Sequence, residues 1–458
     1  MHKGNEEQLL ASWIRGEHRE DLRYFEPRDF KDGRNAEIFR IVKTGGDTLE
    51  RDIIREYKDE YRAIFDFWFP SQYEIIFREA TKDLKERYIH DGDTIEEISE
   101  KLEDLDARLK WARPISEEKV TGTLELMRGK IEAGTAPTII STGFPHLDEK
   151  IDGGLRAGLY IVGAISSLGK TSFCIQLADN IAKTGKPVLF VSLEMAREEL
   201  TAKIISRLTY EISQAKGNGN RDAKTTIKVL NTHEHKGYTL TAQATIKEAF
   251  DELEARGDKL IILEGIGDVT VNRIKAKAKQ AEKMYGKAPV VIVDYLQILA
   301  PEEGYRLTDK QTTDKNVLEL KRLSRDLNTP VITVSSFNRD NYNEPVGLSS
   351  FKESGAIEYG ADVLLGLQLN GMDYQKGEVL GSTKRRDRIK ELRTTAEQNG
   401  RTGKAQALEL KILKNRNGSR GALRLDYVPM FNSFTDAGTI EEDALDGWEK
   451  VDADDIEF

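Results

Sequence analysis

From Thr142 onward, short runs rich in β-branched residues alternate with helical stretches, and this alternation constrains the fold more than any other feature of the chain. Apolar runs of this length, separated by helices, are typical of a parallel sheet whose two faces are both covered. We therefore expect an α/β fold with a parallel-rich central sheet across residues 136–436. The expected strands are Leu159–Ala164, Val188–Leu193, Leu260–Leu263, Val290–Asp294, Val331–Ser335, Val363–Leu369 and Leu408–Leu413.

The front of the chain follows a different pattern. Residues 1–113 show apolar side chains at helical spacing, with no competing strand pattern, and predict a small all-α N-terminal domain. After Pro114, residues 114–135 predict a linker helix with an apolar stripe formed by Val120, Leu124, Met127 and Ile131. Such a stripe requires a partner surface. The polar segment 215–236 is expected to be a surface excursion from the sheet domain.

The charge distribution modifies what the composition suggests. The chain of 458 residues has a net charge of −10, which at first argues against a polyanionic partner. Residues 441–458, however, hold nine acidic residues and one basic residue, so most of the excess lies there. We expect residues 437–458 to form a disordered acidic tail, most simply a solubility feature.

Other sequence features exclude several classes of protein. The lone cysteine, Cys174, excludes an intramolecular disulfide and a cysteine-based zinc site, and six scattered histidines suggest no metal cluster. The chain contains no apolar run of the ~18 residues that a membrane span needs, and its start lacks a secretory pattern. We expect a cytoplasmic protein without a membrane partner.

The strongest motif lies between a predicted strand and a predicted helix, where a P-loop would sit. It runs from Gly163 and Ala164 through Ile165, Ser166, Ser167 and Leu168 to Gly169, Lys170, Thr171 and Ser172. In a P-loop, backbone amides hold phosphates, a lysine reaches the β- and γ-phosphates, and a hydroxyl holds Mg²⁺. Lys170 and Thr171 fit the last two roles. Ala164 stands where a glycine is usual, with Gly163 beside it, and the strand-to-helix context makes a chance Gly-Lys-Thr improbable.

Two carboxylates at strand ends extend this site. Asp294 ends an apolar strand one domain-sized interval after the P-loop, where a Mg²⁺ partner is expected. Glu194 follows the neighbouring strand and can polarise a water that attacks the γ-phosphate. From the residues alone, a capping or buried role for Glu194 is an equally good interpretation.

Taken together, the motifs resemble those of the DnaB-type replicative helicases, hexameric motors of the RecA-like superfamily. The matching segments are Thr142–Asp148 before Gly153–Leu155, the P-loop, Ser192–Met195, Asp294–Gln297, Lys352–Glu358 and Lys414–Gly418. A looser match covers Phe25–Phe30 and Ala36–Phe39 in the helical front. The resemblance spans nearly the whole chain and is far more specific than a P-loop alone.

The resemblance implies roles for several residues. Glu194 would be the catalytic base, and Lys170, Thr171 and Asp294 would hold ATP and Mg²⁺. Lys414 and Arg416 would reach across a subunit interface, with Arg416 as the arginine finger on the neighbour's γ-phosphate. Without the family pattern, a surface arginine at a strand end is the simpler interpretation of Arg416.

The resemblance also implies partners. Lys352, Glu353 and Gly355 match positions that face DNA in the ring channel, where a lysine and backbone amides suit contacts to phosphates of any sequence. The expected assembly is a homo-hexamer on single-stranded DNA, moving 5′ to 3′, with a primase and a helicase loader as further partners. The linker helix would dock on the adjacent motor domain.

One departure from the family concerns the end of the strand 331–335. The family usually has Ser-Gln-Leu-Asn-Arg there, whereas this chain has Ser335, Ser336, Phe337, Asn338 and Arg339. The glutamine that senses the γ-phosphate is thus replaced by Ser336, whose shorter side chain would need a water or another residue. This departure and the atypical front favour a phage or another mobile element as the source, in which case the host cytoplasm is the compartment.

Two alternative functions stay open from the sequence. A RecA-like recombination or repair ATPase is one, and an assembly factor that binds ATP as a structural ligand is another. The basic stretch 384–404 can touch nucleic acid, although a solvated helix in a long connection is the commoner explanation. A fused primase is disfavoured because the front is short and has no cysteine cluster.

Overall fold

The computed structural model describes residues 3–14, 27–30, 32–44, 120–132, 138–165, 167–265, 267–301, 308–338, 342–351, 355–374 and 382–439. The chain divides into two compact units, residues 1–136 and 137–458. Three α-helices are described in the first unit: α1 (Lys3–Ile14), α2 (Gly33–Thr44) and α8 (Val120–Glu132), together with a 3₁₀ turn, η2 (Pro27–Asp29). Residues 45–113 of the expected helical front and residues 440–458 of the expected acidic tail lie outside the described residues, whereas residues 437–439 of that tail end strand β9 (Ser433–Thr439).

A small aromatic cluster holds the first two helices together. Trp13 of α1 lies 5.6 Å from Phe39 of α2, and Phe30 stacks on Phe39 with 4.7 Å between ring centroids. The buried carboxylate of Glu6 accepts hydrogen bonds from the Asp32 amide and the Asn35 side chain. The helical character that the sequence predicts is therefore present in the described part of the front.

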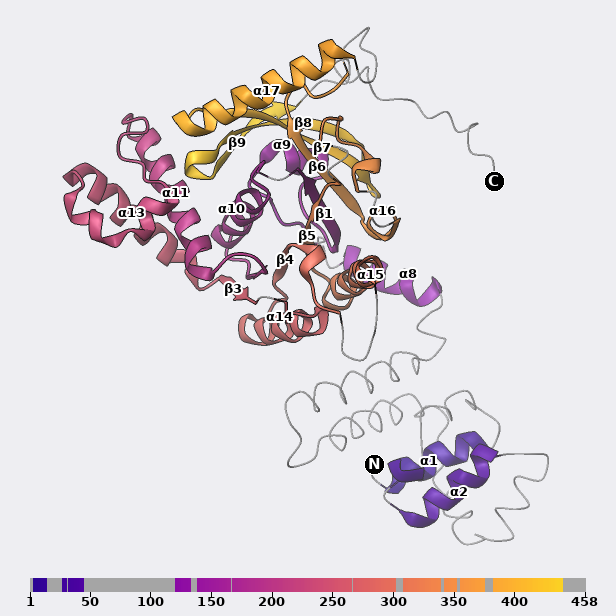
Figure 1. Cartoon of the computed structure of the whole chain (residues 1–458). Helices are drawn as coiled ribbons and strands as arrows, with labels where there is room; N and C mark the ends of the chain where they lie inside the picture. The colour runs from indigo at the N-terminus through magenta and orange to yellow at the C-terminus, as the bar shows by residue number, and fades with distance from the viewer. Residues whose placement is uncertain are drawn as a thin grey trace. The chain divides into compact units, whose positions relative to one another are not determined.

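The second unit is built on one nine-stranded sheet (Figure 1). The strand order is β3-β2-β4-β5-β1-β6-β7-β8-β9; the pairings from β3 to β6 are parallel and those from β6 to β9 antiparallel. The strands are β1 (Gly158–Ala164), β2 (Val188–Ser192), β3 (Leu260–Glu264), β4 (Val290–Asp294), β5 (Pro330–Ser336), β6 (Val363–Leu369), β7 (Gln406–Asn415), β8 (Gly421–Val428) and β9 (Ser433–Thr439).

Helices connect the parallel strands and cover the sheet. The described α-helices of this unit are α9 (Pro145–Lys150), α10 (Lys170–Lys183), α11 (Arg197–Ala215), α12 (Thr226–Leu230), α13 (Leu240–Gly257), α14 (Val271–Tyr285), α15 (Asp309–Leu327), α16 (Gly355–Gly360) and α17 (Thr383–Thr402). The described 3₁₀ turns are η4 (Thr232–Gly237), η5 (Leu296–Ile298), η7 (Leu348–Phe351) and η8 (Pro429–Phe431). Sequence signals set several helix ends: Thr308 caps α15 with Gln311 reaching back, and Ser382 caps α17.

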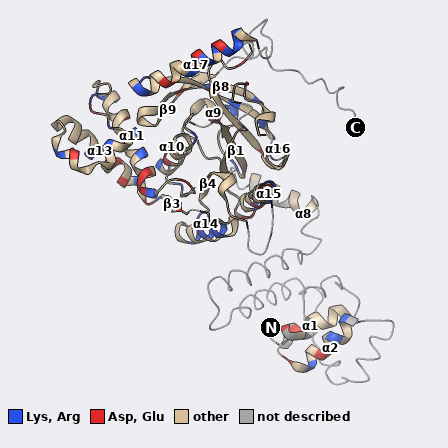
Figure 2. Cartoon of the chain, in the orientation of Figure 1, with Lys and Arg blue, Asp and Glu red and all other residues tan. Residues whose placement is uncertain are grey.

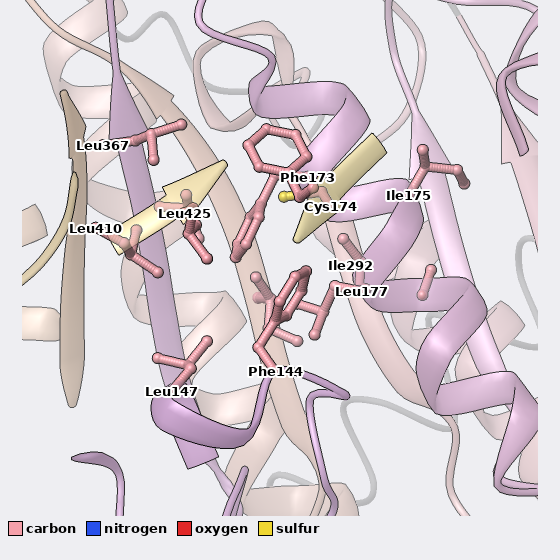
Figure 3. Close-up of a cluster of buried hydrophobic side chains, with 14 of the residues drawn as sticks. Phe144, Leu147, Phe173, Cys174, Ile175, Leu177, Ile292, Leu367, Leu410 and Leu425 are labelled. Atoms are coloured by element: carbon pink, nitrogen blue, oxygen red, sulfur yellow. The ribbon is translucent and has the colours of Figure 1, made fainter. Parts of the chain in front are cut away.

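The two faces of the sheet each have their own core. On β1, Tyr160 and Val162 belong to the cluster under α10 and α11, whereas Leu159 and Ile161 belong to the cluster with α14 and α15. Figure 3 shows the first cluster, in which Phe173 of α10 stacks on Phe144, 5.3 Å away. Because alternate residues of a strand point to opposite faces, these strands are apolar throughout. This confirms the predicted α/β fold with a parallel-rich sheet.

Two expectations need correction. The sequence does not predict β8 and β9, which extend the sheet as an antiparallel edge. The predicted surface excursion 215–236 is partly buried: Asp222, Ala223 and Lys224 are almost fully covered, and Ala223 packs with Val428 and Phe431. The polar composition misleads because Lys224 is held by backbone and side-chain oxygens of its surroundings rather than by water.

Candidate functional site: a P-loop at the carboxyl edge of the sheet

The P-loop connects β1 to α10 at the carboxyl edge of the parallel strands, where ligands of open α/β sheets bind. Gly169 has φ +81°, a left-handed conformation that glycine adopts without strain, and a Cβ there would lie 2.6 Å from the Tyr427 ring. Ser167 also has a positive φ, and Ser172 lies in the first turn of α10. Ser166 lies outside the described residues.

The first part of the loop is equally tight. Gly163 is the residue before Ala164 at the end of β1, and a Cβ on it would lie 2.2 Å from the Phe337 ring and 2.3 Å from the Phe351 ring. A glycine is therefore needed at 163, while Ala164 is buried without conflict. This explains how the loop keeps its path with alanine at the position where glycine is usual.

Lys170 lies at the mouth of this loop. Its Nζ donates to the carbonyl oxygens of Ala164 and Ile165, each 3.1 Å away. Burial lowers the pKa of Lys170, and the negative charges of Asp294 and Glu194 act in the opposite direction. The lysine is thus a partly desolvated cation held by backbone carbonyls, which suits exchange of these contacts for a phosphate ligand.

Asp294 and Thr171 come together as the sequence predicts. Asp294 ends β4, is 3 % exposed, and accepts a hydrogen bond from the Thr171 side chain. Burial raises the pKa of Asp294, and the nearby charge of Glu194 raises it further, while Lys170 and Lys203 oppose the shift. A buried carboxylate beside a hydroxyl is the oxygen pair that Mg²⁺ favours, and a divalent cation would stabilise the charged form. The residues present fit that metal.

Glu194 follows β2 in a fixed turn. The Ser192 hydroxyl donates to the Met195 carbonyl at 2.6 Å, and the Leu193 amide donates to the Asp294 carbonyl at 2.9 Å. Glu194 itself is exposed, and its charge acts on both Lys170 and Asp294. The carboxylate is therefore neither buried nor a described helix cap, so these two alternatives to a functional role do not apply.

Lys414 and Arg416 lie at the other edge of the sheet. Asn415, between these two residues, pairs with Val363 of β6, which in turn pairs with Tyr160 of β1. Tyr160 lies four residues before Ala164, where the P-loop begins, so about 13 Å along the strand direction separates Asn415 from the level of the P-loop. Lys414 donates to the Glu358 carbonyl at 2.5 Å, and burial together with the charges of Arg416 and Lys321 lowers its pKa. Arg416 is half exposed and lies 3.4 Å from the Asp362 carboxylate. Neither side chain joins the P-loop of its own chain.

The predicted DNA-facing residues are only partly described. Gly355 begins α16 and is exposed, while Lys352 and Glu353 lie outside the described residues. The basic stretch 384–404 forms α17, which carries both signs of charge (Figure 2). Arg385 is not solvated as expected for that stretch: it is buried and donates toward the Met372 carbonyl.

Contacts to the P-loop and α10 from the end of the sheet are not predicted by the sequence. Asn432, in the turn between η8 and β9, accepts hydrogen bonds from Ser172 at 3.0 Å and Lys203 at 2.8 Å. The Tyr427 ring lies against Gly169 and stacks on Phe434. The contacts of Asn432, and that of Tyr427 with Gly169, join residues more than 200 positions apart, and the sequence offers no local signal for them.

Comparisons with known proteins agree with this geometry. A family model described as the DnaB-like helicase C terminal domain matches residues 139–436. The replicative DNA helicase DnaB of Geobacillus stearothermophilus is 27 % identical over 301 residues, which cover 65 % of this chain and 56 % of the relative. DnaB of Pasteurella multocida is 30 % identical over 328 residues, covering 69 % of this chain and 59 % of the relative. The chain spans little more than half the length of these relatives.

Solved structures show the same fold. One of them, described as an ATPase domain, has a TM-score of 0.54 and 22 % identity, covering 69 % of this chain and 98 % of that domain. A DnaB-like replicative helicase, described with its interactions with primase, has a TM-score of 0.59 and 19 % identity, covering 95 % of this chain and 99 % of that one. The expected resemblance and the RecA-like ATPase fold are confirmed. Because the family model covers about two thirds of the residues, this chain belongs to the DnaB-like helicase C-terminal domain family.

Proposed function

We propose that this chain is a ring-forming, ATP-driven replicative DNA helicase that moves on single-stranded DNA and separates duplex DNA at the fork. The observation that carries the proposal is the division of the site between two edges of one sheet. Lys170, Thr171, Asp294 and Glu194 lie at the carboxyl edge, where they would act on phosphate, metal and water, and the cationic side chains of Lys414 and Arg416 lie at the other edge. Such a division suits hydrolysis between neighbouring copies of the chain.

At the carboxyl edge, each residue has a distinct task. Lys170 would exchange its two carbonyl contacts for the oxygens of the β- and γ-phosphates. Thr171 and Asp294 would hold Mg²⁺, which neutralises charge on the phosphate oxygens. Glu194, exposed to solvent beside Lys170 and Asp294, would orient the attacking water and accept its proton.

The opposite edge would serve the neighbouring copy. Arg416 cannot reach its own P-loop, because about 13 Å of strand separates the two levels. As the finger of an adjacent subunit, Arg416 would stabilise charge that develops on the γ-phosphoryl oxygens, with Lys414 beside it. Its weak contact to Asp362, at 3.4 Å, would be exchanged for phosphate. The rate of hydrolysis would then depend on how the two subunits are placed against each other.

The DNA contacts and partners follow from the same proposal. Gly355 at the start of α16, with Lys352 and Glu353 before it, would contact one strand through its phosphates. The proposal also includes a homo-hexamer that moves 5′ to 3′ along DNA, with a primase and a helicase loader as partners. A solved DnaB-like helicase described with its primase interactions supports the primase partner. Among the described helices, none is long and apolar enough to cross a bilayer.

The central experiment measures ATP hydrolysis with and without single-stranded DNA, together with strand displacement on forked duplexes. We expect Lys170→Ala to lose hydrolysis and Arg416→Ala to lose about 10³–10⁵ in rate while still binding nucleotide. Arg424→Ala is a matched control, because Arg424 is similarly exposed and has only a 3.7 Å contact to Asp426. Full hydrolysis by Arg416→Ala would refute the shared site. DNA-stimulated hydrolysis without displacement by the unmodified chain would favour a recombination ATPase instead.

The linker helix α8 supplies an independent test of ring formation. Val120, Leu124, Met127 and Ile131 are between 48 and 76 % exposed, so the predicted apolar stripe lacks a covering surface in the described chain. We propose that it docks on the motor domain of the next subunit. Replacing Leu124 and Met127 by Asp should yield monomers or dimers in light scattering, whereas Thr121→Asp, off the stripe, should not. A hexamer that persists in the double variant would contradict the docking.

A further inference from the structure

At the end of β5, where the resembled family has a glutamine that senses the γ-phosphate, this chain has Ser336. Ser336 is exposed, ends the strand, and offers one hydroxyl on a single carbon. Its neighbour Ser335 is buried and accepts a hydrogen bond from the Gln297 side chain at 2.9 Å, so it is already engaged. If the proposed function holds, another residue has to make this contact.

Tyr342 is placed beside the P-loop, a few residues beyond β5. It lines a small hollow together with Ile165 and Leu168 of the P-loop and Arg393 of α17. The ring is half-buried and packs against the core cluster that contains Phe337 and Phe351. A phenol fixed at this wall of the P-loop can present its hydroxyl to a phosphate.

The surroundings of Lys170 agree with this placement of Tyr342. Ile165, which lines the hollow with Tyr342, accepts a hydrogen bond from the Lys170 Nζ through its carbonyl. Burial lowers the pKa of Lys170, and Tyr342, Asp294 and Glu194 all act in the opposite direction. The lysine is the residue expected to hold the terminal phosphates.

Helix α17 holds Tyr342 from behind. The Arg393 guanidinium donates to the Tyr342 carbonyl. Arg385 of the same helix donates to the next carbonyl, that of Asn343, and approaches the Glu344 carboxylate at 3.4 Å. A main-chain carbonyl bound by an arginine cannot swing away freely, so α17 holds the main chain at Tyr342 in place.

We propose that Tyr342 donates its hydroxyl to the terminal phosphate of ATP, the contact that Ser336 cannot make, and that Arg393 positions Tyr342 for it. Tyr342 is a nucleotide-contacting residue in this proposal and Arg393 a positioning residue. The same segment continues through Val346, whose amide donates to Gln368 at 2.7 Å, to Phe351 at the edge of the expected DNA loop. A change at the phosphate would thus be transmitted toward that loop through a short segment held by hydrogen bonds.

The test compares nucleotides with and without a γ-phosphate. Fluorescence titration would measure the dissociation constants of a slowly hydrolysed ATP analogue and of ADP for the full chain with Mg²⁺. Tyr342→Phe should weaken the ATP analogue about ten- to a hundredfold and leave ADP unchanged, because one hydrogen bond to a charged group is lost. Tyr285→Phe is the matched control: its hydroxyl, on α14, donates to the Asp258 carbonyl and not to the segment after β5, and it should keep the preference for the ATP analogue.

Two further variants make the inference specific. Adding Ser336→Gln to Tyr342→Phe should restore the preference, because an amide at the end of β5 would replace the phenol. Arg393→Ala should reduce the preference in the same direction but less than Tyr342→Phe, whereas Arg386→Ala, exposed on the same helix, should not change it.

The outcomes separate this inference from the proposed function. An unchanged preference in Tyr342→Phe, or equal weakening of both nucleotides, would overturn the role of Tyr342. If Lys170→Ala still lost hydrolysis in that case, the proposed ATPase function would stand. Hydrolysis by Lys170→Ala would instead overturn the proposed function itself, whatever Tyr342 does.

Discussion

The glycine at position 163 allows a stability prediction that can be worked from distances. A methyl group there would lie 2.2 Å from the Phe337 ring and 2.3 and 2.4 Å from two atoms of the Phe351 ring. Both rings are 4 % exposed and meet edge to face with 4.8 Å between centroids, so neither can withdraw into solvent. Gly163→Ala therefore forces extra volume into a closed layer between β1 and the segments after β5.

The expected cost follows from two opposing effects. Overpacking of a buried core costs about 1–3 kcal/mol, while exchanging glycine for alanine in a strand regains roughly 0.4–1 kcal/mol of unfolded-state entropy. The net loss of about 1–2 kcal/mol should lower the melting temperature by about 2–8 °C in a thermal scan of the full chain. Nucleotide affinity should fall as well, because Gly163 leads directly into the P-loop turn.

Two variants decide whether the reasoning is right. Gly237→Ala is the control, since no atom lies within 4 Å of the place where its Cβ would stand and its φ is ordinary; it should change stability by less than about 0.5 kcal/mol. Adding Phe337→Leu to Gly163→Ala should recover part of the lost stability by removing the overlapping ring edge. A Gly163→Ala protein as stable as the unmodified chain, or a double variant less stable than both singles together, would refute the steric argument.

Three further predictions concern the same domain. Because burial raises the pKa of Asp294, the Mg²⁺ affinity measured by titration should fall as the pH drops through that raised pKa, at a higher pH than for an ordinary carboxylate. Asp294→Asn should bind Mg²⁺ weakly, and its Mg²⁺ affinity should not change over this pH range. Asp179→Ala should cost about 3–5 kcal/mol in urea unfolding, because Arg207 and Arg256 would be left buried without their shared carboxylate; a loss below about 1 kcal/mol would contradict this. Gly169→Ala should abolish nucleotide binding in a filter assay while Gly185→Ala, strained but in open space, should retain it.

The sequence predicts the elements of the sheet domain well where a short run of residues is enough to define them. The strands Val290–Asp294 and Val363–Leu369 have the predicted bounds, because unbroken β-branched runs leave few alternatives. The P-loop and its helix are equally local. In contrast, the antiparallel strands β8 and β9 mix polar with apolar residues, and a prediction based on unbroken apolar runs does not find them.

The residues of the candidate site also differ in whether the local sequence predicts them. Lys170, Thr171, Asp294 and Glu194 can be found because each follows a strand, and parallel strands bring their ends together. The proposed place of Tyr342 cannot be predicted, because the residue lies in an irregular segment, packs on a distant core cluster and is bound by Arg393, 51 residues later. The basic run does form a largely exposed helix, as the sequence suggests, but Arg385 and Arg393 turn inward to bind backbone carbonyls, which composition does not reveal.

The distance between the two edges of the sheet has a consequence for how activity depends on protein concentration. If Arg416 of one copy completes the site of the next, a solitary chain carries two half-sites and no whole one. Specific activity per milligram should then decline as the protein is diluted below the dissociation constant of its assembly, even with saturating ATP. Mixing in chains that lack the arginine should silence one neighbouring site for each defective copy, whereas the defective copy's own site should stay active beside an unmodified neighbour.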